Sequence, residues 1–371
     1  MTEPAILAVN PGTTTTRCAL FHAGASAISP IMEKTLEHDE AVMAEFASIA
    51  AQLEFRAEHV AEFLREHLGH YRLIACAGRG GMLTPVPSGV IEVNDALVDF
   101  ALHAPVYHHA SNLGAPLVHR IAQGYGVPAF VVDPVSVDEL MPEARISGVA
   151  ELPRFSFVHA LNIRACGRRL SSEIDKPFTS LKSVVAHLGA GFSIAALVNG
   201  RLVDSSNRME ISPFTPERAG GLPPLPLIEL CYSGDYTRKE LLERLYGQGG
   251  VFGYLGTKDI RKVEAMVDEG HEQARLVYKA MLYQISKAVG AMAAATNFDL
   301  DAIVLTGGLA NSKRITGYLS DRLSRLAPVH VYPGSDECRA LAEGAARVLD
   351  GTELPMTWPI DATQGVANAH S

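Results

Sequence analysis

The amino-acid sequence predicts an α/β fold built from two similar domains, each a mixed β-sheet flanked by helices. Three observations support this prediction. Strand-like apolar runs alternate with segments of helical periodicity, and one hairpin pattern occurs twice, about half a chain apart. The length of 371 residues is also sufficient for two domains. The strand-like runs are ILAVN, RCALF, RLIACAG, AFVVD, SVVAHL, SIAALV, RLVDS, AIVLTGG and VHVY.

The first hairpin lies close to the start of the chain, where residues 5–21 read AILAVNPGTTTTRCALF. An apolar run stops at Asn10, a Pro-Gly turn and four threonines follow, and the chain is apolar again after Arg17. The same order returns in residues 183–204, SVVAHLGAGFSIAALVNGRLVD, where the apolar run ends at His187 before a Gly-Ala-Gly turn. We interpret the two segments as equivalent hairpins of a duplicated fold.

Both hairpin turns have the composition of an anion-binding turn. Glycines and hydroxyl residues between antiparallel strands allow several backbone N–H groups to converge on one phosphate. Neither turn has the Gly-Lys-Ser/Thr sequence and following helix of a Walker loop. An ordinary hairpin with β-favouring threonines is the alternative for each turn alone, but the matching placement of the two favours phosphate binding. The predicted contacts are Asn10, Thr14, Arg17, His187, Gly189, Gly191 and Ser193.

A third glycine turn lies in residues 302–312, AIVLTGGLANS. A strand runs into Gly307 and Gly308, and a helix is predicted to begin near Ser312. A backbone without side chains can lie against a flat group such as adenine or ribose, although such a glycine pair also allows close packing of strand and helix. We expect Gly307, Gly308 and Asn311 to contact a nucleotide.

Helical patterns separate many of the strands. The longest amphipathic pattern, residues 41–69, predicts one helix that ends at Gly69. Residues 271–297 are apolar nearly all round in their second half, which predicts a buried helix. We place an N-terminal domain at 1–150, a C-terminal domain at 151–350 whose last helix can pack on the first domain, and a partly disordered tail at 351–371.

Composition argues against several classes of function. The formal net charge of -9 and the pI of about 5.9 argue against a general nucleic-acid surface. The five cysteines are scattered and form no CxxC pair, which fits a reducing compartment and gives neither a zinc site nor a disulfide framework. The first ten residues lack the pattern of a signal peptide, and the longest apolar stretch is too short to span a bilayer. We expect a cytoplasmic protein without nucleic-acid or membrane partners.

Short segments along most of the chain carry a specific resemblance, and PFTPERAGGLP (213–223) is the most specific of them. The others are GRGGM (78–82), HHASNLGAP (108–116), VVDPV (131–135), ARISG (144–148), FVHALN (157–162), YLGTKD (254–259) and YPGSDECRALAEGA (332–345). Together these segments resemble the acetate and butyrate kinases of the acetokinase family. The residues of PFTPERAGGLP and HASNLG are more similar to those of butyrate kinases than to those of acetate kinases.

The resemblance implies an actin-like (ribonuclease H-like) fold in both domains, with a cleft between them. Family members transfer phosphate between ATP and a short-chain carboxylate, with Mg²⁺, and form an acyl phosphate. A butyrate kinase that uses ATP/ADP and Mg²⁺ and forms a homodimer is therefore expected, with the carboxylate on the N-terminal domain and the nucleotide on the C-terminal domain. Arg17 in place of the usual lysine, the run of threonines and the turn Gly-Gly-Leu-Ala-Asn depart from the common pattern.

The resemblance also assigns the cationic residues. Phosphoryl transfer to an ionised carboxylate needs positive charge around the equatorial oxygens and no general base. Arg218 and Arg79 are the expected guanidinium groups, since a guanidinium binds two oxygens in one plane. His159 resembles the histidine that donates to the transferring group, and a core histidine is its alternative role. The expected carboxylate-binding residues are Arg79, Pro216 and His109, or His108 in another register.

The same resemblance implies a metal site. Glu337 falls where the family has a metal-linked glutamate, and its alternative role is a helix N-terminal charge. Asp133 ends the strand AFVVD; it is expected to bind a metal water or to orient an arginine in catalysis, and a turn cap is its alternative role. Asn10 is the third residue expected near the metal, because Mg²⁺ binds few protein groups and keeps several waters.

Two further interpretations stay open at this point. Acetate, propionate or a branched acid could replace butanoate, because one methylene changes discrimination only about 10- to 200-fold. Alternatively, the chain could be a nucleotide-binding regulator or an actin/Hsp70-like ATPase without a carboxylate acceptor, which would hydrolyse ATP slowly whether or not a short acid is present.

Overall fold

The computed structural model describes residues 2–24, 28–206 and 212–360. They form two compact units. Unit 1 contains the described residues of Met1–Glu139, Ala160–Asn162 and Asp336–Ser371, and unit 2 contains those of Leu140–His159 and Ile163–Ser335. Residues 140–150 therefore group with the second unit and the last helix with the first. Most of the tail expected to be partly disordered, residues 361–371, lies outside the described residues.

Unit 1 is built on a mixed sheet. Its strands are β1 (Pro4–Pro11), β2 (Thr15–Ala23), β3 (Ile28–Glu37), β4 (Arg72–Arg79), β5 (Val90–Glu92), β6 (Ala129–Val132) and β12 (Met356–Thr357). Within the described residues these seven strands lie in the order β12-β5-β6-β4-β1-β2-β3. β1, β2 and β3 form an antiparallel meander, β4 pairs parallel with β1, and β6 pairs parallel with β4. Val9 pairs with Cys18 in the hairpin and with Gly78 across the parallel pair.

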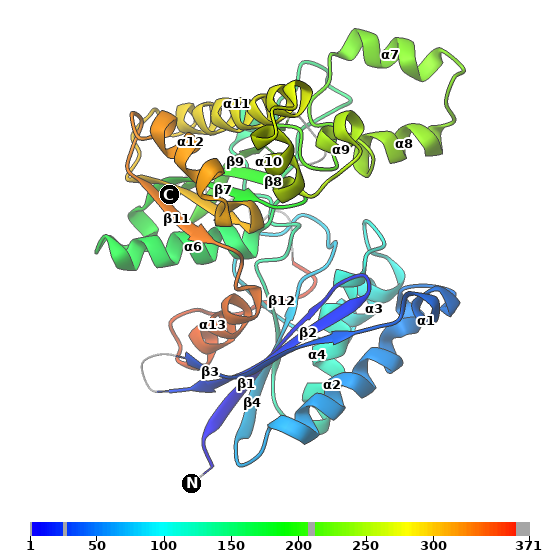
Figure 1. The fold of residues 1–371 in the computed structure, drawn as a ribbon. Coiled ribbons are helices and arrows are strands. Elements are labelled where there is room, and N and C mark those ends of the chain that lie inside the picture. Colours follow the sequence, from blue (N-terminus) through cyan, green and yellow to red (C-terminus); the bar gives the residue numbers. More distant parts are fainter. Residues whose placement is uncertain (1, 25–27, 207–211, 361–371) are drawn as a thin grey trace. The chain divides into compact units, whose positions relative to one another are not determined.

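Helices cover both faces of this sheet (Figure 1). They are α1 (Glu40–Glu45), η1 (Ala50–Gln52), α2 (Leu53–His67), α3 (Asp95–His103), η2 (Ala110–Leu113), α4 (Gly114–Tyr125) and α13 (Glu337–Leu349). α13 packs on β1 and β4, while α4 packs on β4 and β6 and also contacts α2. Glycine allows α4 to approach β4 closely, because a Cβ on Gly78 of β4 would lie 2.4 Å from the carbonyl oxygen of Gly114 in α4.

The single helix predicted for residues 41–69 is wrong. The chain forms α1, then η1 and α2, because Phe46 adopts an extended conformation and ends the first helix. The Phe46 ring lies 5.6 Å from the Phe55 ring, measured between centroids, and the Ser48 hydroxyl accepts a hydrogen bond from Ala51 N. The apolar spacing continues across the break, so periodicity alone did not reveal it.

Unit 2 repeats the strand order of unit 1. Its strands are β7 (Lys182–Leu188), β8 (Phe192–Val198), β9 (Arg201–Ser206), β10 (Ala302–Gly307) and β11 (Val329–Pro333). In the described part of the chain they lie in the order β11-β10-β7-β8-β9. β7, β8 and β9 form an antiparallel meander, and β10 and β11 add parallel strands. The order β6-β4-β1-β2-β3 in unit 1 matches it strand for strand, which confirms the predicted α/β fold with two similar domains.

The helices of unit 2 complete its core. They are α5 (Pro142–Arg145), α6 (Ala160–Glu173, whose first residues group with unit 1), η3 (Phe178–Ser180), α7 (Pro224–Tyr232), α8 (Arg238–Tyr246), α9 (Gly250–Leu255), α10 (Ile260–Asp268), α11 (Glu272–Ala294), η4 (Gly308–Asn311) and α12 (Lys313–Leu323). α11 packs on β7 and β8, with α9, α10 and α12 against it. The second half of α11 was predicted to be buried all round. This prediction is wrong, because Tyr283 and Lys287 are exposed.

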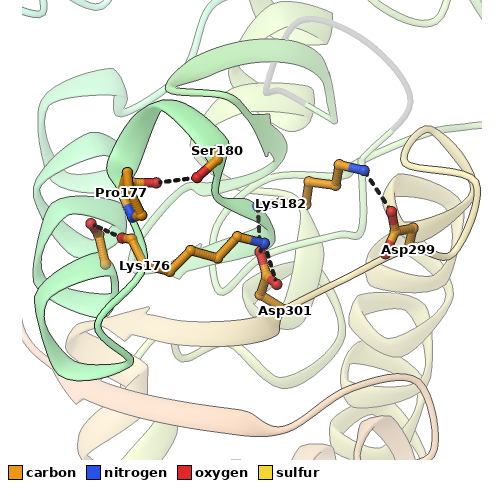
Figure 2. Close-up of polar contacts among 7 residues, drawn as sticks. Lys176, Pro177, Ser180, Lys182, Asp299 and Asp301 are labelled. Carbon is orange, nitrogen blue, oxygen red and sulfur yellow. Dashed lines mark hydrogen bonds and ion pairs between the residues drawn. The ribbon is translucent and has the colours of Figure 1, made fainter.

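A cluster of lysines and aspartates fixes the first residues of β7 and β10 (Figure 2). The Asp301 carboxylate accepts from Lys176 Nζ at 2.6 and 2.7 Å and from the backbone N–H of Lys182 at 2.8 Å. The ammonium of Lys182 turns the other way and binds Asp299 at 2.5 Å. Asp301 thereby ties the turn before β7 to the start of the neighbouring strand.

The cysteines of the chain are free thiols. Cys18, Cys76, Cys166 and Cys338 are buried, and burial raises the pKa of each of these thiols. Cys231, on α7, is exposed. Among the helices of the described residues, none combines the length and apolarity needed to cross a membrane.

Candidate functional site

In unit 1, three predicted residues that are far apart in sequence come together. Asn10 lies on β1, Arg79 is the last residue of β4, and Glu337 is the first residue of α13. Glu337 Oε2 accepts from Asn10 Nδ2 at 2.5 Å and from Arg79 Nη1 at 2.7 Å. Arg79 Nη1 also lies 3.4 Å from Asn10 Oδ1. Glu337 is buried, so the ion pair is shielded from water and defines the position of both partners.

Asp133 follows β6 directly. Its strand neighbour Val132 pairs with Arg79, so Asp133 lies one residue beyond that pair at the same edge of the sheet. Asp133 is buried, has a φ of 39°, and exchanges two hydrogen bonds with Gly89: its Oδ1 accepts from Gly89 N at 2.8 Å, and its N–H donates to Gly89 O at 2.9 Å. These bonds show a turn-stabilising role. The metal-linked and catalytic roles predicted for Asp133 stay predictions.

The turn between β1 and β2 contains Thr14, whose carbonyl accepts from His38 N at 2.8 Å. Gly12 N donates to Thr15 O at 2.8 Å and closes the turn. Arg17 lies further along β2, is exposed, and places its Nε 3.6 Å from Glu33 Oε1 on β3. The ion pair gives Arg17 a role on the sheet surface, and its predicted phosphate contact stays a prediction.

His109 is positioned by the start of η2. Its Nδ1 accepts from Ser111 N at 3.1 Å and lies 2.9 Å from the Ser111 hydroxyl, so the ring caps the short helix. His108 is exposed beside it. A ring whose Nδ1 accepts carries its proton on Nε2, so the Nε2 of His109 is a donor in this tautomer. The choice between His108 and His109 remains a prediction.

In unit 2, the second hairpin brings two predicted histidines together. His187, on β7, pairs with Ser193 on β8. The His187 ring stacks on the His159 ring, with centroids 4.0 Å apart and planes 10° from parallel. His159 precedes α6, and its Nδ1 lies 2.8 Å from the Ser193 hydroxyl. The stack therefore stands at the end of the hairpin, beside the turn that contains Gly189 and Gly191.

Arg218 lies against this turn. A Cβ on Gly191 would be 2.0 Å from Arg218 Nη1, so glycine is needed for the guanidinium to approach the backbone. In residues 2–24, 28–206 and 212–360 no carboxylate pairs with Arg218; the adjacent Glu217 instead lies 3.1 Å from Lys258 Nζ. Burial lowers the pKa of Arg218 from its usual value, although the group stays charged at neutral pH.

The loop that carries Arg218 is fastened to the same turn by Thr215. The Thr215 hydroxyl donates to Ala190 O at 2.7 Å and accepts from Arg218 N at 3.1 Å. Pro216, predicted to bind the carboxylate, is buried, and its carbonyl accepts from Phe252 N at 2.9 Å. This contact shapes the loop, and the substrate contact of Pro216 stays a prediction.

The third glycine turn follows β10. Gly307 has a φ of 87° and exchanges two hydrogen bonds of 2.9 Å with Gly334, while a Cβ on it would lie 2.4 Å from Leu188 O. Close packing thus explains Gly307. Gly308 differs, because a Cβ there would meet no atom within 4 Å, which leaves a bare stretch of backbone. Asn311 Nδ2 donates back to Gly308 O at 3.0 Å and holds the turn in shape.

The donor set of unit 1 fits Mg²⁺. Glu337 supplies a carboxylate and Asn10 an amide oxygen. Both hydrogen bonds given above are accepted by Oε2 of Glu337, and among the described residues none is accepted by Oε1. Mg²⁺ takes one or two carboxylates and completes its shell with waters and phosphate oxygens. In the part of the chain that the structure describes, no three histidine, cysteine, aspartate or glutamate side chains cluster in a way that could hold a metal.

Sequence reasoning missed three residues that shape these turns. They are Arg56, which donates to the first hairpin turn, Thr215 in the Arg218 loop, and Glu264, which accepts from Ser312 at the start of α12. Arg56 had a signal: it falls among Ala57, Val60 and Phe63 on the apolar face of a predicted helix, where a cation needs a specific partner. Thr215 lies in the PFTPERAGGLP segment, but nothing in the sequence indicated its hydrogen bonds, and Glu264 had no signal.

The residues of unit 2 described above fall inside a segment that matches a known family. Residues 152–331 match the acetokinase family. The acetokinase segment includes His159, His187, Arg218 and the third glycine turn, whereas Asn10, Arg79 and Glu337 lie outside it. The closer likeness to butyrate kinases stays a prediction.

Solved structures with the same fold cover nearly the whole chain. Acetate kinase from Porphyromonas gingivalis has a TM-score of 0.74 and 20% identity, with 93% of this chain and 100% of that one covered. Propionate kinase from Francisella tularensis has a TM-score of 0.70 and 19% identity, with 93% and 99% covered. Acetate kinase from Entamoeba histolytica has a TM-score of 0.71 and 16% identity, with 92% and 98% covered. These similarities confirm the actin-like α/β fold.

Proposed function

We propose that the protein is an ATP-dependent short-chain carboxylate kinase that prefers butanoate. The observation that supports this most is Arg218, a partly buried guanidinium held against the glycine turn of a hairpin, with no carboxylate partner among the described residues. A buried cation is costly without an anion, so this arrangement suits a charged ligand such as a phosphoryl group. The acetokinase match of residues 152–331 supports the same assignment.

The two units carry different parts of this function. Unit 2 has two glycine turns and the histidine stack, which suit the phosphates and the flat base of ATP. Unit 1 has Arg79 and His109, which suit a carboxylate, and Thr14 in the first turn, which suits a terminal phosphoryl oxygen.

The proposed reaction is a direct in-line displacement. A carboxylate oxygen forms a bond to the γ-phosphorus of ATP, and the bond from that phosphorus to the β–γ bridging oxygen breaks, with its electron pair leaving on ADP. Arg79, Arg218 and His159 stabilise the charge on the transferring group. Since the acid is ionised at neutral pH, no side chain has to remove a proton.

Mg²⁺ is the cation that this chemistry implies. Glu337 and Asn10 are the residues that would hold it, and it would supply positive charge to the phosphates when bound. Arg79 has a separate role: its ion pair with Glu337 fixes the guanidinium before substrate binds, so little reorganisation is needed during the reaction.

A hydroxamate assay of acyl phosphate with acetate, propionate, butanoate and isobutanoate tests the proposal. We expect ATP- and Mg²⁺-dependent turnover, fastest with butanoate. Arg218→Ala should lower kcat at least about 100-fold with the fold retained, as removal of a charge-stabilising donor does. Arg275→Ala, an exposed arginine on α11, is the matched control. ATP hydrolysis that no acid stimulates would refute the kinase assignment, and faster turnover of acetate or propionate would refute only the preference for butanoate.

The resemblance also supports a cytoplasmic homodimer, which we include in the proposal. Sedimentation equilibrium of the purified protein tests the assembly, and a monomer at micromolar concentration would refute it. The proposal for location is tested by fractionation of the source cells, with activity expected in the soluble fraction.

A further inference from the structure

Arg56 is a fully buried cation behind the first hairpin turn. It lies on α2, and its exposed fraction is 0%. Burial lowers the pKa of Arg56 to about 10, so the side chain remains charged at neutral pH. It is among the largest fully buried side chains of the chain, in a class of residue that is almost never buried without a specific partner.

The guanidinium of Arg56 uses its five N–H groups on neutral acceptors. Nη1 donates to Thr15 O at 2.8 Å and to Thr16 Oγ1 at 3.0 Å. Nη2 donates to Thr13 O at 2.8 Å and to Gln52 Oε1 at 3.0 Å, and Nε donates to the same Gln52 oxygen at 3.1 Å. No carboxylate of the described residues is within ion-pair distance, so the hydrogen bonds are satisfied but the charge is not neutralised.

These bonds orient the backbone of the turn. In a planar trans peptide the C=O and the following N–H point in opposite directions. Because Thr13 O points at Arg56, the N–H of Thr14 points away from it. Thr14 lies between the two strands, and its N–H donates to no acceptor in the part of the chain that the structure describes. Arg56 thus fixes the direction of the Thr14 N–H, which points away from the guanidinium, and places a positive charge behind that N–H.

We propose that Arg56 is a positioning residue that gives the first hairpin turn its affinity for a phosphoryl group, through a charge that Gln52 leaves unneutralised. The inference rests on the proposed function, since it concerns the phosphate that the turn would receive. Arg56 does not itself contact the substrate. It acts through Thr13, Thr15 and Thr16, which it holds, and through its electrostatic field.

Gln52→Glu separates the charge from the geometry. The glutamate keeps an oxygen where Arg56 donates, so the hydrogen bonds survive, and it neutralises the cation. We expect the urea midpoint to stay equal or rise and KM for acetyl phosphate, in the reverse reaction with ADP, to rise about 10-fold. KM for ADP should not change, because ADP lacks the phosphate that the turn receives. Gln123→Glu, the same substitution at an exposed position of unit 1, is the matched control.

A purely structural role for Arg56 gives a different result. In that case Gln52→Glu would leave KM for acetyl phosphate unchanged, which would overturn the inference. Arg56→Lys and Arg56→Met provide a second comparison. Both lose hydrogen bonds and stability, but lysine keeps the charge, so we expect KM for acetyl phosphate to rise less in Arg56→Lys than in Arg56→Met. Equal KM values in the two variants would overturn the inference that the charge of Arg56 contributes to phosphoryl binding.

A failure of the proposed function is distinguishable from a failure of this inference. If the wild-type protein turns over no acid, the kinase assignment fails, and a calorimetric titration with inorganic phosphate then decides the role of Arg56. Weaker phosphate binding by Gln52→Glu than by wild type supports the inference, and equal or absent binding in both proteins overturns it.

Discussion

Glu337 holds the unit 1 cluster together, because one of its oxygens accepts from both Asn10 and Arg79. A carboxylate at the first position of a helix also interacts favourably with the helix dipole. Removal of this charge would leave the partly buried Arg79 guanidinium without its ion-pair partner. At the scale of single residues, Glu337 is therefore the most informative position in unit 1.

Glu337→Gln keeps the shape of the side chain and removes its charge. We expect kcat to fall about 100-fold or more, since the proposed metal ligand and the orientation of Arg79 are both lost. The Mg²⁺ concentration for half-maximal rate should rise as well. Measurement of turnover over a range of Mg²⁺ concentrations checks both effects.

Glu343→Gln is the control for this substitution, because it lies on the same helix and accepts from Arg339 Nε at 3.0 Å in a partly exposed pair. Such pairs contribute little, so turnover and Mg²⁺ dependence should match wild type. If Glu337→Gln behaved like Glu343→Gln, Glu337 would have no part in metal binding or catalysis.

At the scale of elements, Asp301 is the contact that sets the register at the start of β10. It accepts three hydrogen bonds. Lys176 Nζ donates to both carboxylate oxygens, and the backbone N–H of Lys182 donates to Oδ2. Asp301→Ala leaves that backbone N–H and the ammonium without their acceptor, which should lower the free energy of unfolding by about 1–3 kcal/mol. Urea unfolding monitored by circular dichroism measures the loss.

Asp299→Ala is the matched substitution two residues earlier. Asp299 pairs with the exposed Lys182 ammonium and holds no backbone group (Figure 2), so the loss of stability should be clearly smaller than for Asp301→Ala. Equal losses in the two variants would mean that the Lys182 backbone contact does not stabilise β10.

The sequence predicted most elements because periodicity and turn residues agree with burial. Each of the nine strand-like runs corresponds to a strand, although Asp133 and Gly308 lie one residue beyond β6 and β10. α12 begins after Ser312, whose hydroxyl accepts from Ile315 N as an N-cap. β3 was missed because ISPIMEKTLE is a mostly exposed edge strand without clear alternation. β5 and β12 are too short to give a pattern.

The candidate site was predictable only in part. Asn10 and Glu337 are 327 positions apart, and no local pattern reports that β1 and α13 bring them into contact. The resemblance supplied these residue types, but it did not supply their hydrogen bonds. The same holds for the stack of His159 on His187, because ring contacts depend on how α6 begins beside β7.

At the scale of the whole molecule, one strand order is used twice. The meander β1-β2-β3 with β4 and β6 has its counterpart in β7-β8-β9 with β10 and β11. In both units the first hairpin turn carries glycine next to an element that presents an arginine: Arg56 from α2 in unit 1 and Arg218 from the 213–223 loop in unit 2. Each turn therefore has a guanidinium next to it, although the two arginines come from elements that are not equivalent in the two units.

The stability of the molecule should depend on pH through His38. Burial, with smaller contributions from Arg56 and His59, lowers the pKa of His38 from 6.5 to about 4. Between these values the unfolded chain takes up a proton that the folded chain does not, so stability is full above the unfolded pKa and falls as pH decreases through this window.

His38→Gln removes this titration. Between about pH 7.5 and about pH 5, wild type should lose about 2 kcal/mol more stability than the variant. Urea unfolding of both proteins at the two pH values gives the difference, in which the titration of the other groups cancels. Parallel losses in wild type and variant would show that His38 titrates normally in the folded state.

The contrast between the thiol of Cys231 and the other four has a practical consequence. A maleimide fluorophore under native conditions should attach to α7 alone, because the thiolate form is suppressed and access is closed at the buried positions. The chain therefore already contains a single attachment point for an optical reporter, and no cysteine has to be removed from its interior to use it.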